Sequence, residues 1–506
     1  MLWLALHLPL LSLEAFRATL LPGAPGERQR PVALIDRHRI AAVDAAAAAA
    51  GLRPGMKRAT ALALAADLLL ADSQAARDAA ALQAVAHAAL AFTPAVTLHD
   101  AQTVLLEVQA SLRLFGGPAA LQRRLLEALA PLGHRVQAAA APTALGAALL
   151  ATWHPADRGD LVLGAHARHL PALQPLLDAA PVGLLGPGRE HGEALQGMGL
   201  HRLADLRALP RAGLARRFGA ALLDELDRAL GLQPDPRQWI ALPAAFDSRL
   251  ELYARAETTD QLLAGAAVLL ARLVAWAQAR QARVGAFTLR MGHERQRRAP
   301  AQATELRIEL AEPVLDAAHL QGLLRERLAR CRLAAPALEL RLHCNHLVAG
   351  AAPSGELFPT RASQDEGLLR LLERLRARLG DEQVQRLEPV ADHRPERANR
   401  SVPAQGRVPA AGAAQAASPL PHHRPAWLLP DPLPLAERDA LPLLEGRPLQ
   451  LVSGPERIEA GWWDGPPAVR DYFIAQADDG SLVWVWRGRL PAAAGDAGWF
   501  LQGRFA

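Results

Sequence analysis

The chain of 506 residues has little cysteine, little lysine and few aromatic residues. Its two cysteines, Cys331 and Cys344, are too few for a disulfide framework or for a zinc site built on thiolates, and fit a reducing compartment. Lys57 is the single lysine, so almost all positive charge is arginine. Aromatic residues make up 4%, and six of the ten tryptophans lie in the last 80 residues. This clustering marks the C-terminal region as a separate unit.

Hydrophobic residues make up 51% and charged residues 21%, a balance typical of globular rather than disordered proteins. At roughly 150 residues per domain, the length predicts about three or four domains. The opening residues 1–16 are apolar, but they lack a basic start and Glu14 interrupts them, so they predict neither a signal peptide nor a membrane span. We expect a soluble cytoplasmic protein with no membrane association.

The net charge is +5. An arginine-rich basic chain is compatible with nucleic acid, because a guanidinium holds phosphate through two parallel hydrogen bonds. A GC-rich codon bias explains the arginine and alanine content equally well.

Strand and helix patterns alternate through the N-terminal part of the chain. Residues Leu2–Leu8 predict a buried strand, followed by a helix from about Ser12. Residues 31–36 and 103–108 predict two more strands, with a mostly helical stretch over 41–71 between them. A helix, a strand of small residues and a second helix follow. This alternation indicates an α+β or α/β core.

Residues 181–232 predict short helices separated by glycines, similar to paired helix-hairpin-helix elements. Such hairpins present backbone N–H groups to phosphates without reading bases, and Arg211, Arg216 and Arg217 are candidate DNA contacts here. A plain helical connector is the alternative.

Residues 246–347 predict a compact β-α-β-β-α-β module. Its central hairpin carries arginines that alternate with apolar residues, which places their charges on one face along a phosphate backbone. A solvated sheet face is the alternative. The candidate DNA-binding residues are Arg290, Arg295, Arg297, Arg298 and Arg307.

Three further patterns follow. An amphipathic helix carries Leu368, Leu371, Leu372, Leu375 and Leu379 on one stripe, and Gly380 ends it. Residues 397–425 are rich in Pro, Ala, Ser and Gly and predict a linker. The last 80 residues predict short aromatic strands and a small β domain.

Two motifs resemble those of the Y-family DNA polymerases. LALHLPLLSLEAF (4–16) is similar to the first motif, in which a strand with a metal-binding Asp runs into a helix, and LLEVQASLRLFGG (105–117) is similar to the second. The resemblance implies an α+β multidomain right hand with a small C-terminal β domain added. Its divisions are palm (1–30 and 76–178), fingers-like (31–75), thumb with helix-hairpin-helix (179–240), little finger (241–350), clamp-motif loop and amphipathic helix (351–396), linker (397–425) and Trp-rich domain (426–506).

The residues that match the polymerase metal ligands are not carboxylates. Two-metal nucleotidyl transfer requires carboxylates that hold two Mg²⁺ ions. The resemblance places Ala5 and His7 at the two Asp positions of the first motif, and Gln102 and Thr103 at the Asp-Glu pair of the second. It therefore implies a polymerase fold without catalysis and without a metal or cofactor. A divergent active polymerase is the alternative, with Asp100 as a possible ligand two residues before Gln102.

The expected grip on a nucleotide is also absent. By resemblance, the Tyr and Arg that contact the triphosphate correspond to Ala45 and Ala48, and no lysine follows Lys57 to match the family's palm lysine.

The tail resembles that of the ImuB family, the inactive Y-family homologues of bacterial SOS mutagenesis cassettes. The residues that carry this resemblance are GWWDG (461–465), RDYFIAQADDGSLVWVWRG (470–488) and GWFLQGRF (498–505). The resemblance implies a DNA-damage-induced scaffold for translesion synthesis. Its implied partners are DNA, the β sliding clamp, a RecA-like protein of the ImuA type and an error-prone C-family DNA polymerase.

A clamp contact needs a short peptide with two apolar anchors. Ser354, Gly355, Glu356, Leu357 and Phe358 stand where the family carries this motif, and they keep Leu-Phe but lack the usual Gln and first Leu. We expect weaker clamp binding than for a consensus peptide. A loop packed on its own domain is the alternative.

The aromatic residues of the tail suit partner docking, with base stacking or a domain core as the alternatives. His343, Cys344 and His346 are a poor zinc site, because neighbouring residues on a strand point to opposite faces. The candidate partner-binding residues are Trp462, Trp463, Tyr472, Trp484, Trp486 and Trp499.

Overall fold

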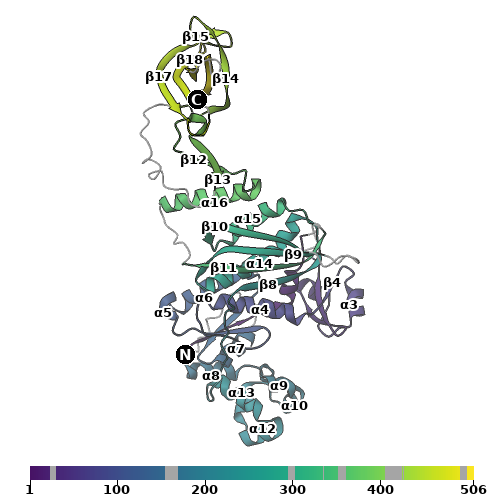
Figure 1. Cartoon of the computed structure of the whole chain (residues 1–506). Helices are drawn as coiled ribbons and strands as arrows, with labels where there is room; N and C mark the ends of the chain where they lie inside the picture. The colour runs from purple at the N-terminus through teal and green to yellow at the C-terminus, as the bar shows by residue number, and fades with distance from the viewer. Residues whose placement is uncertain are drawn as a thin grey trace. The chain divides into compact units, whose positions relative to one another are not determined.

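A computed structural model of the chain describes residues 1–22, 30–153, 169–293, 303–333, 335–350, 361–404, 424–425, 427–465, 467–489 and 498–505, with 361–366 described by their backbone alone. The chain divides into two compact units, Met1–Glu366 and Gly367–Ala506. Figure 1 labels the elements of both units.

The first sheet, which we call the palm sheet, has four antiparallel strands in the order β5-β6-β1-β7. β1 is central, and Ala5 pairs with Leu105 on β6 and with Ala139 on β7. The strands predicted at the N-terminus and over 103–108 are confirmed to within one residue at each end. The strands are β1 (Trp3–His7), β5 (Val96–Leu98), β6 (Thr103–Glu107) and β7 (Gln137–Ala141).

The palm sheet is buried on both faces. Leu4 and Leu6 of β1 pack with α4 and α6, whereas Trp3 and Ala5 pack with α7. Two covered faces explain why β1 is an unbroken apolar run instead of an alternating one. The helices of this region are α1 (Leu11–Arg17), α4 (Ala75–Ala89), α5 (Leu112–Phe115), α6 (Pro118–Leu129), η2 (Ala130–Leu132) and α7 (Ala144–Trp153).

The region between α1 and α4 corrects the prediction of a mostly helical stretch over 41–71. A three-stranded sheet in the order β3-β2-β4 forms here, with β2 parallel to β4 and antiparallel to β3. β2 supplies backbone partners on both sides, and this pairing overrides the helix preference of the neighbouring alanines and leucines. The elements are β2 (Val32–Asp36), β3 (Arg39–Val43), α2 (Ala45–Ala49), α3 (Arg58–Leu64) and β4 (Leu69–Asp72).

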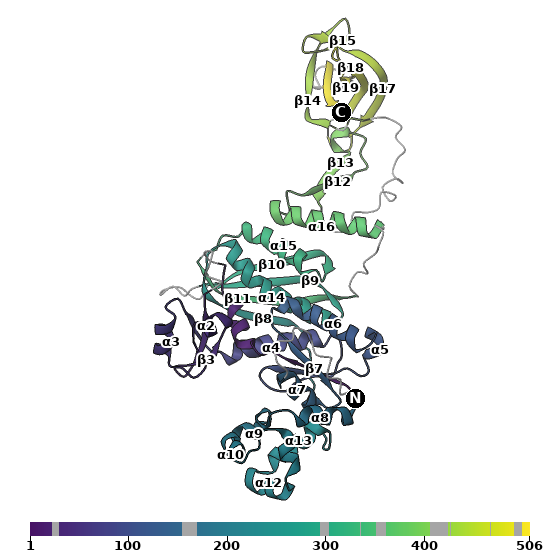
Figure 2. The same ribbon diagram turned by 180° about the vertical axis from the view of Figure 1, so that it is seen from behind.

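The thumb is helical, as its glycine-punctuated sequence predicts, and Figure 2 shows its helices grouped together. Leu195, Leu203, Leu206 and Leu222 are buried in one cluster that continues into α7. Gly188 is required by a close approach, since a Cβ there would lie 2.1 Å from the carbonyl oxygen of Val182. The helices are α8 (Leu170–Asp178), η3 (Val182–Leu184), α9 (Gly186–Glu190), α10 (Gly192–Gly197), α11 (Leu203–Ala208), α12 (Arg211–Phe218) and α13 (Ala220–Leu230).

The little-finger module has the predicted β-α-β-β-α-β order, with the sheet β10-β9-β11-β8. Its two helices contact each other and the sheet, so they cover the same face (Figure 1). α14 is long and apolar enough to cross a membrane, but 61% of its most apolar window is buried inside the protein, as in a core helix. The elements are β8 (Phe246–Ala256), α14 (Thr259–Ala279), β9 (Ala282–His293), β10 (Ala303–Val314), α15 (Ala317–Ala329) and β11 (Ala337–Ala349).

The second unit corrects the predicted linker at its start. Strand β13 (Asn399–Pro403) pairs with β12 (Gln385–Pro389), and the turn η4 (Pro395–Arg397) lies between them. The first residues of the Pro-rich segment therefore form part of a short hairpin. The predicted amphipathic helix is α16 (Arg361–Leu379). Its leucine stripe is largely exposed, and the buried positions of α16 are instead Leu369, Glu373 and Ala377.

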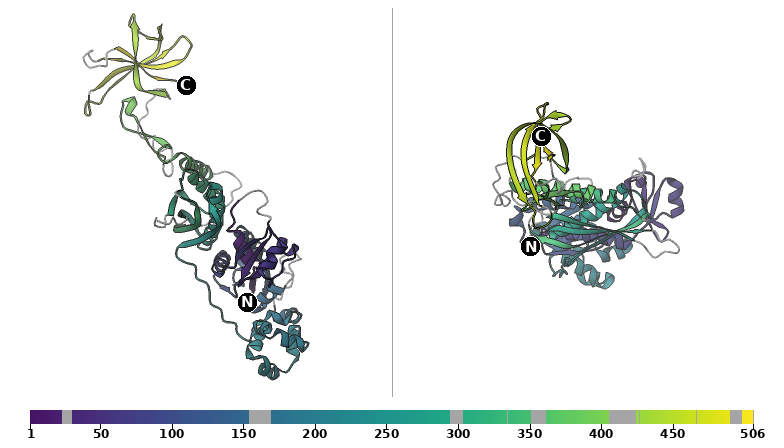
Figure 3. Two further views of the ribbon diagram at one scale, coloured as in Figure 1. Left: turned by 90° about the vertical axis from the view of Figure 1, so that its right-hand side faces the viewer. Right: turned by 45° about the horizontal axis from the view of Figure 1, so that its top comes forward.

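The C-terminal domain is the predicted β domain, a sheet in the order β16-β15-β14-β20-β19-β18-β17. Figure 3 shows its strands curving around an interior. Trp499 and Val485 belong to one buried cluster, and Tyr472, Trp484 and Trp486 to another. The strands are β14 (Trp427–Arg438), β15 (Leu441–Leu444), β16 (Arg447–Pro448), β17 (Gln450–Ala460), β18 (Ala468–Gln476), β19 (Leu482–Gly488) and β20 (Gly498–Arg504).

Candidate functional site

The positions that the sequence resemblance aligns with the polymerase metal ligands lie together at one end of the palm sheet. His7 on β1 pairs with Thr103 on β6, and the N–H of Leu8 donates to the carbonyl of Gln102 at 2.8 Å. Ala5 lies two residues back on the same face of β1 and is fully buried. The register thus brings the matched positions close together, and none of them carries a carboxylate.

His7 and Thr103 form a buried polar contact at this end of the sheet. Nδ1 of His7 lies 3.0 Å from Oγ1 of Thr103. Burial lowers the pKa of His7, and the charge of Asp100 opposes this shift only in part. The ring is therefore neutral at pH 7 and satisfied by a hydroxyl, which suits a structural role.

Three carboxylates close in sequence to these positions accept backbone hydrogen bonds. Asp100 accepts from the N–H of Gln102 at 2.8 Å, and Glu107 accepts from a residue two positions along the chain at 3.1 Å. Glu14 accepts from the N–H of Arg135 at 3.0 Å. Across the described ranges, no group of three or more His, Cys, Asp or Glu side chains converges as metal ligands do.

Ala45 and Ala48, which the resemblance aligns with the triphosphate contacts, lie on α2. Asp44 caps this helix by accepting from the N–H of Ala47 at 2.7 Å, and it also pairs with Arg17. The methyl side chains of the two alanines provide no hydrogen-bond donor for a phosphate.

Of the three thumb arginines predicted to contact DNA, one forms an ion pair with a described carboxylate and two do not. Arg211 pairs with Asp227 at 2.5 Å. Arg216 and Arg217 are exposed in the last turn of α12, and neither has a carboxylate partner among the described residues. Arg216 and Arg217 are therefore the better candidates for the predicted phosphate contacts of the thumb.

We predicted that the thumb hairpins present their backbone N–H groups to phosphate, but the turn at the start of α9 has one of these groups already bonded. The N–H of Gly186, at the start of α9, points at both carboxylate oxygens of Glu225, at 3.1 and 3.2 Å. A phosphate at this turn would have to displace a carboxylate of the protein.

The little-finger hairpin carries mixed charge. Nε of Arg290 on β9 lies 3.8 Å from Glu305, and Arg307 on β10 pairs with Glu309 at 2.6 Å. Both arginines are more than half exposed, which leaves them accessible to solvent. The other three arginines predicted for this surface lie outside the described residues, namely Arg295, Arg297 and Arg298.

The predicted clamp motif also lies outside the described residues, and the structure tests none of its five positions. These are Ser354, Gly355, Glu356, Leu357 and Phe358.

The predicted partner-binding aromatics separate into two groups. Trp462 and Trp463 are 77% and 56% exposed and meet edge to face in the turn after β17. The other four are interior, which corrects the prediction that they bind a partner, because core packing leaves them no accessible face. The buried side chains are Tyr472, Trp484, Trp486 and Trp499.

Arg394, which we did not predict from the sequence, stabilises the turn that carries Trp462 and Trp463, called the tryptophan turn below. The guanidinium of Arg394 donates to Asp392 at 2.7 Å and to both oxygens of Asp464 at 2.8 Å, and it lies 5.6 Å from the ring centre of Trp463. The hydrogen bonds to Asp392 and Asp464 raise the pKa of Arg394. The Asp of the GWWDG motif was the available signal, since an Asp beside two exposed aromatics invites a cationic partner.

Comparison with known proteins identifies the family. A model of the impB/mucB/samB family matches residues 14–152. Protein ImuB of Caulobacter vibrioides, in strains NA1000 / CB15N and ATCC 19089 / CIP 103742 / CB 15, is 32% identical over 474 residues, which cover 90% of this chain and 100% of the relative. The chain belongs to the ImuB family. Membership gives it a role related to DNA damage.

Similar solved structures include a Dbh ternary complex, at 15% identity and a TM-score of 0.39, and DinB from Sulfolobus solfataricus, at 15% identity and a TM-score of 0.38. Each similarity covers 69% of this chain and 100% of the other.

Proposed function

We propose that this ImuB-family protein is a non-catalytic adaptor in DNA-damage-induced, error-prone translesion synthesis. It binds DNA without sequence preference, and it holds the β sliding clamp, a RecA-like protein and an error-prone C-family DNA polymerase together in the cytoplasm. The polymerase partner performs the synthesis.

The observation that carries the proposal is the composition of the palm-sheet end where β1 meets β6. His7 pairs with Thr103 there, and Ala5 is sealed in the core. Placing two Mg²⁺ ions at this end would require at least two carboxylates facing each other. A neutral His–Thr pair and an alanine supply no such charge.

DNA binding is supported by arginines on three elements of the first unit, α12, β9 and β10. Arg216 and Arg217 on α12 are exposed and without carboxylate partners among the described residues, while Arg290 and Arg307 face solvent beside glutamates. Such contacts go to phosphates and fix position without reading sequence.

Protein partners are supported by the second unit. Trp462 and Trp463 expose large apolar rings on a turn held by Arg394, and aromatic side chains of this kind are enriched where proteins dock. The family's clamp motif remains a proposal for residues 354–358.

Primer extension with the purified protein tests the absence of catalysis. We expect no nucleotide incorporation with Mg²⁺ or Mn²⁺, whereas a primed template should still shift in a gel at low salt.

A divergent active polymerase is the competing function, and one observation favours it. Asp100 is exposed and close enough to His7 to influence its pKa. Incorporation that is abolished by Asp100→Ala but survives Asp36→Ala, a change at another exposed carboxylate, would establish this alternative and refute the adaptor.

A further inference from the structure

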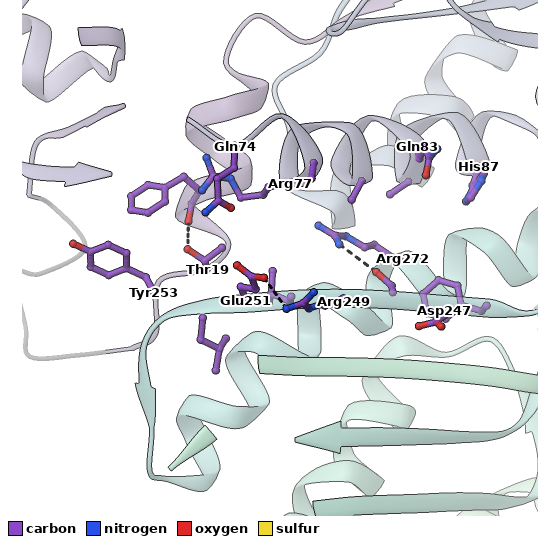
Figure 4. A pocket seen from close by; sticks show the side chains of 18 of the residues that line it. Thr19, Gln74, Arg77, Gln83, His87, Asp247, Arg249, Glu251, Tyr253 and Arg272 are labelled. Carbon is purple, nitrogen blue, oxygen red and sulfur yellow. Dashed lines mark hydrogen bonds and ion pairs between the residues drawn. The ribbon is translucent and has the colours of Figure 1, made fainter. Parts of the chain in front are cut away.

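An open cavity of about 670 Å³ lies between palm helix α4 and strand β8 of the little-finger module. It belongs wholly to the first unit. Its volume falls in the range of small-molecule sites. Ala76, Ala80 and Ala84 form one wall at helical spacing, and their short side chains leave the space open. Figure 4 shows Arg272 between α4 and β8, with Gln83 and His87 on the helix above.

Arg272 is the unusual residue of this cavity. It projects from α14, is only 7% exposed, and donates one hydrogen bond, from Nη1 to Oγ of Ser248 at 3.2 Å. No other hydrogen bond or ion pair joins it to the described residues, which leaves four N–H groups unused. Burial alone lowers the pKa of Arg272, with no carboxylate opposing the shift.

The acidic residues of the lining are engaged elsewhere or exposed. Both carboxylate oxygens of Asp247 accept from Arg341. Glu251 pairs with Arg249 at 2.7 Å. Asp72 is exposed. None of them neutralises the guanidinium at the floor of the cavity.

Further donors line the same space. Arg77 lines the cavity from α4, where its Nε pairs with Asp78 at 3.6 Å and its Nη2 donates to the carbonyl oxygen of Asp72 at 3.5 Å. The side-chain amide of Gln83 and the ring of His87 also line the cavity. A buried cation with several donors around it suits a group with three or more acceptor oxygens better than a carboxylate with two.

We propose that this cavity binds a small phosphate-bearing molecule, with the guanidinium of Arg272 as the main partner of the phosphate. The ligand would supply the counter-charge that the protein does not. This site is separate from the DNA and protein contacts proposed above. Free phosphate and a phosphate ester share this chemistry, and the experiment distinguishes them.

Calorimetric titration of the full-length protein with inorganic phosphate, and separately with a nucleoside monophosphate, tests the proposal. We expect millimolar or tighter binding of at least one probe. Arg272→Gln should weaken it at least about tenfold, because a charge-assisted hydrogen bond is lost. Arg249→Gln is the matched control, since Arg249 lines the same cavity but is paired with Glu251 and Glu339, and it should bind within about twofold of wild type.

Ala80→Leu provides a second variant that leaves every arginine in place. It fills the cavity from the α4 wall and should also abolish binding. The proposal is overturned if wild type binds neither probe, if either Arg272→Gln or Ala80→Leu binds like wild type, or if primed DNA displaces the phosphate completely.

Discussion

Buried charges in this protein differ in whether the fold supplies their partners. Arg394 is enclosed by Asp392 and Asp464, and this cluster fixes the turn that carries Trp462 and Trp463. Arg272 is equally buried, but its one hydrogen-bond partner among the described residues is the hydroxyl of Ser248. Since an unpaired buried charge is costly, the first arrangement stabilises a surface, whereas the second prepares a site for an external anion.

Histidine burial predicts acid sensitivity. Burial lowers the pKa of His87 from its ordinary 6.5, so the unfolded chain binds a proton more readily than the folded one. Stability should therefore be highest above about pH 6.5 and fall as the pH drops through that value. His87→Gln should reduce this loss of stability. Thermal unfolding measured from pH 7.5 to 5.5 tests it, since these values bracket the ordinary histidine pKa of roughly 6.5.

The control for this prediction is His201→Gln, a change at an exposed histidine. It should leave the pH profile unchanged. An identical profile for wild type and His87→Gln would show that the burial of His87 does not contribute to acid sensitivity.

At the scale of elements, the thumb shows that hydrogen bonds and ion pairs within the protein decide which groups of a helix can contact phosphate. The N–H of Gly186 is already taken by Glu225, so the first hairpin offers phosphate less than its glycines suggest. The exposed end of α12 instead carries Arg216 and Arg217, which have no carboxylate partner among the described residues. DNA affinity of the thumb should therefore reside in side chains more than in the helix N-terminus.

Salt-dependent DNA binding tests this assignment. Arg216→Gln/Arg217→Gln should weaken binding of primed DNA and lower the slope of log K against log [salt] by about 2, since each lost phosphate contact removes about 0.9. Gel shifts or fluorescence anisotropy over a salt series measure the slope. Arg123→Gln/Arg124→Gln, two exposed arginines on α6, should leave it unchanged. Equal slopes for both double variants would remove the thumb from the DNA contacts.

At the scale of the whole molecule, two compact units separate the proposed tasks. The candidate phosphate contacts on α12, β9 and β10 belong to Met1–Glu366, whereas the exposed tryptophan turn belongs to Gly367–Ala506. Because the two surfaces lie in different units, a change on one should leave the other intact.

Co-purification with the RecA-like protein and the C-family polymerase tests this separation. Trp462→Ala/Trp463→Ala should reduce recovery of at least one partner by about tenfold or more, in line with aromatic hot spots, without altering the DNA mobility shift. Trp427→Ala removes another tryptophan, 73% exposed, and serves as the control. Undiminished recovery of both partners would exclude the tryptophan turn as their docking surface.

The sequence by itself predicted the order of the elements in the palm, the thumb, the little finger and the C-terminal domain. Hydrophobic periodicity and glycine breaks are local properties, and they are visible without the fold. It also identified Ala5, His7, Gln102 and Thr103 as positions without carboxylates, because residue identity needs no coordinates.

Only the tertiary structure decided which side chains those elements bury or expose. Strands β3 and β13 exist because β2 and β12 pair with them as hairpins, and β4 because it pairs with the more distant β2, which composition does not record. Of the six aromatic residues predicted to bind a partner, four lie in the core and two are accessible. That no described carboxylate pairs with Arg272 is likewise set by which residues of α4 and β8 surround it. Such properties depend on contacts between residues far apart in the chain, so no local pattern encodes them.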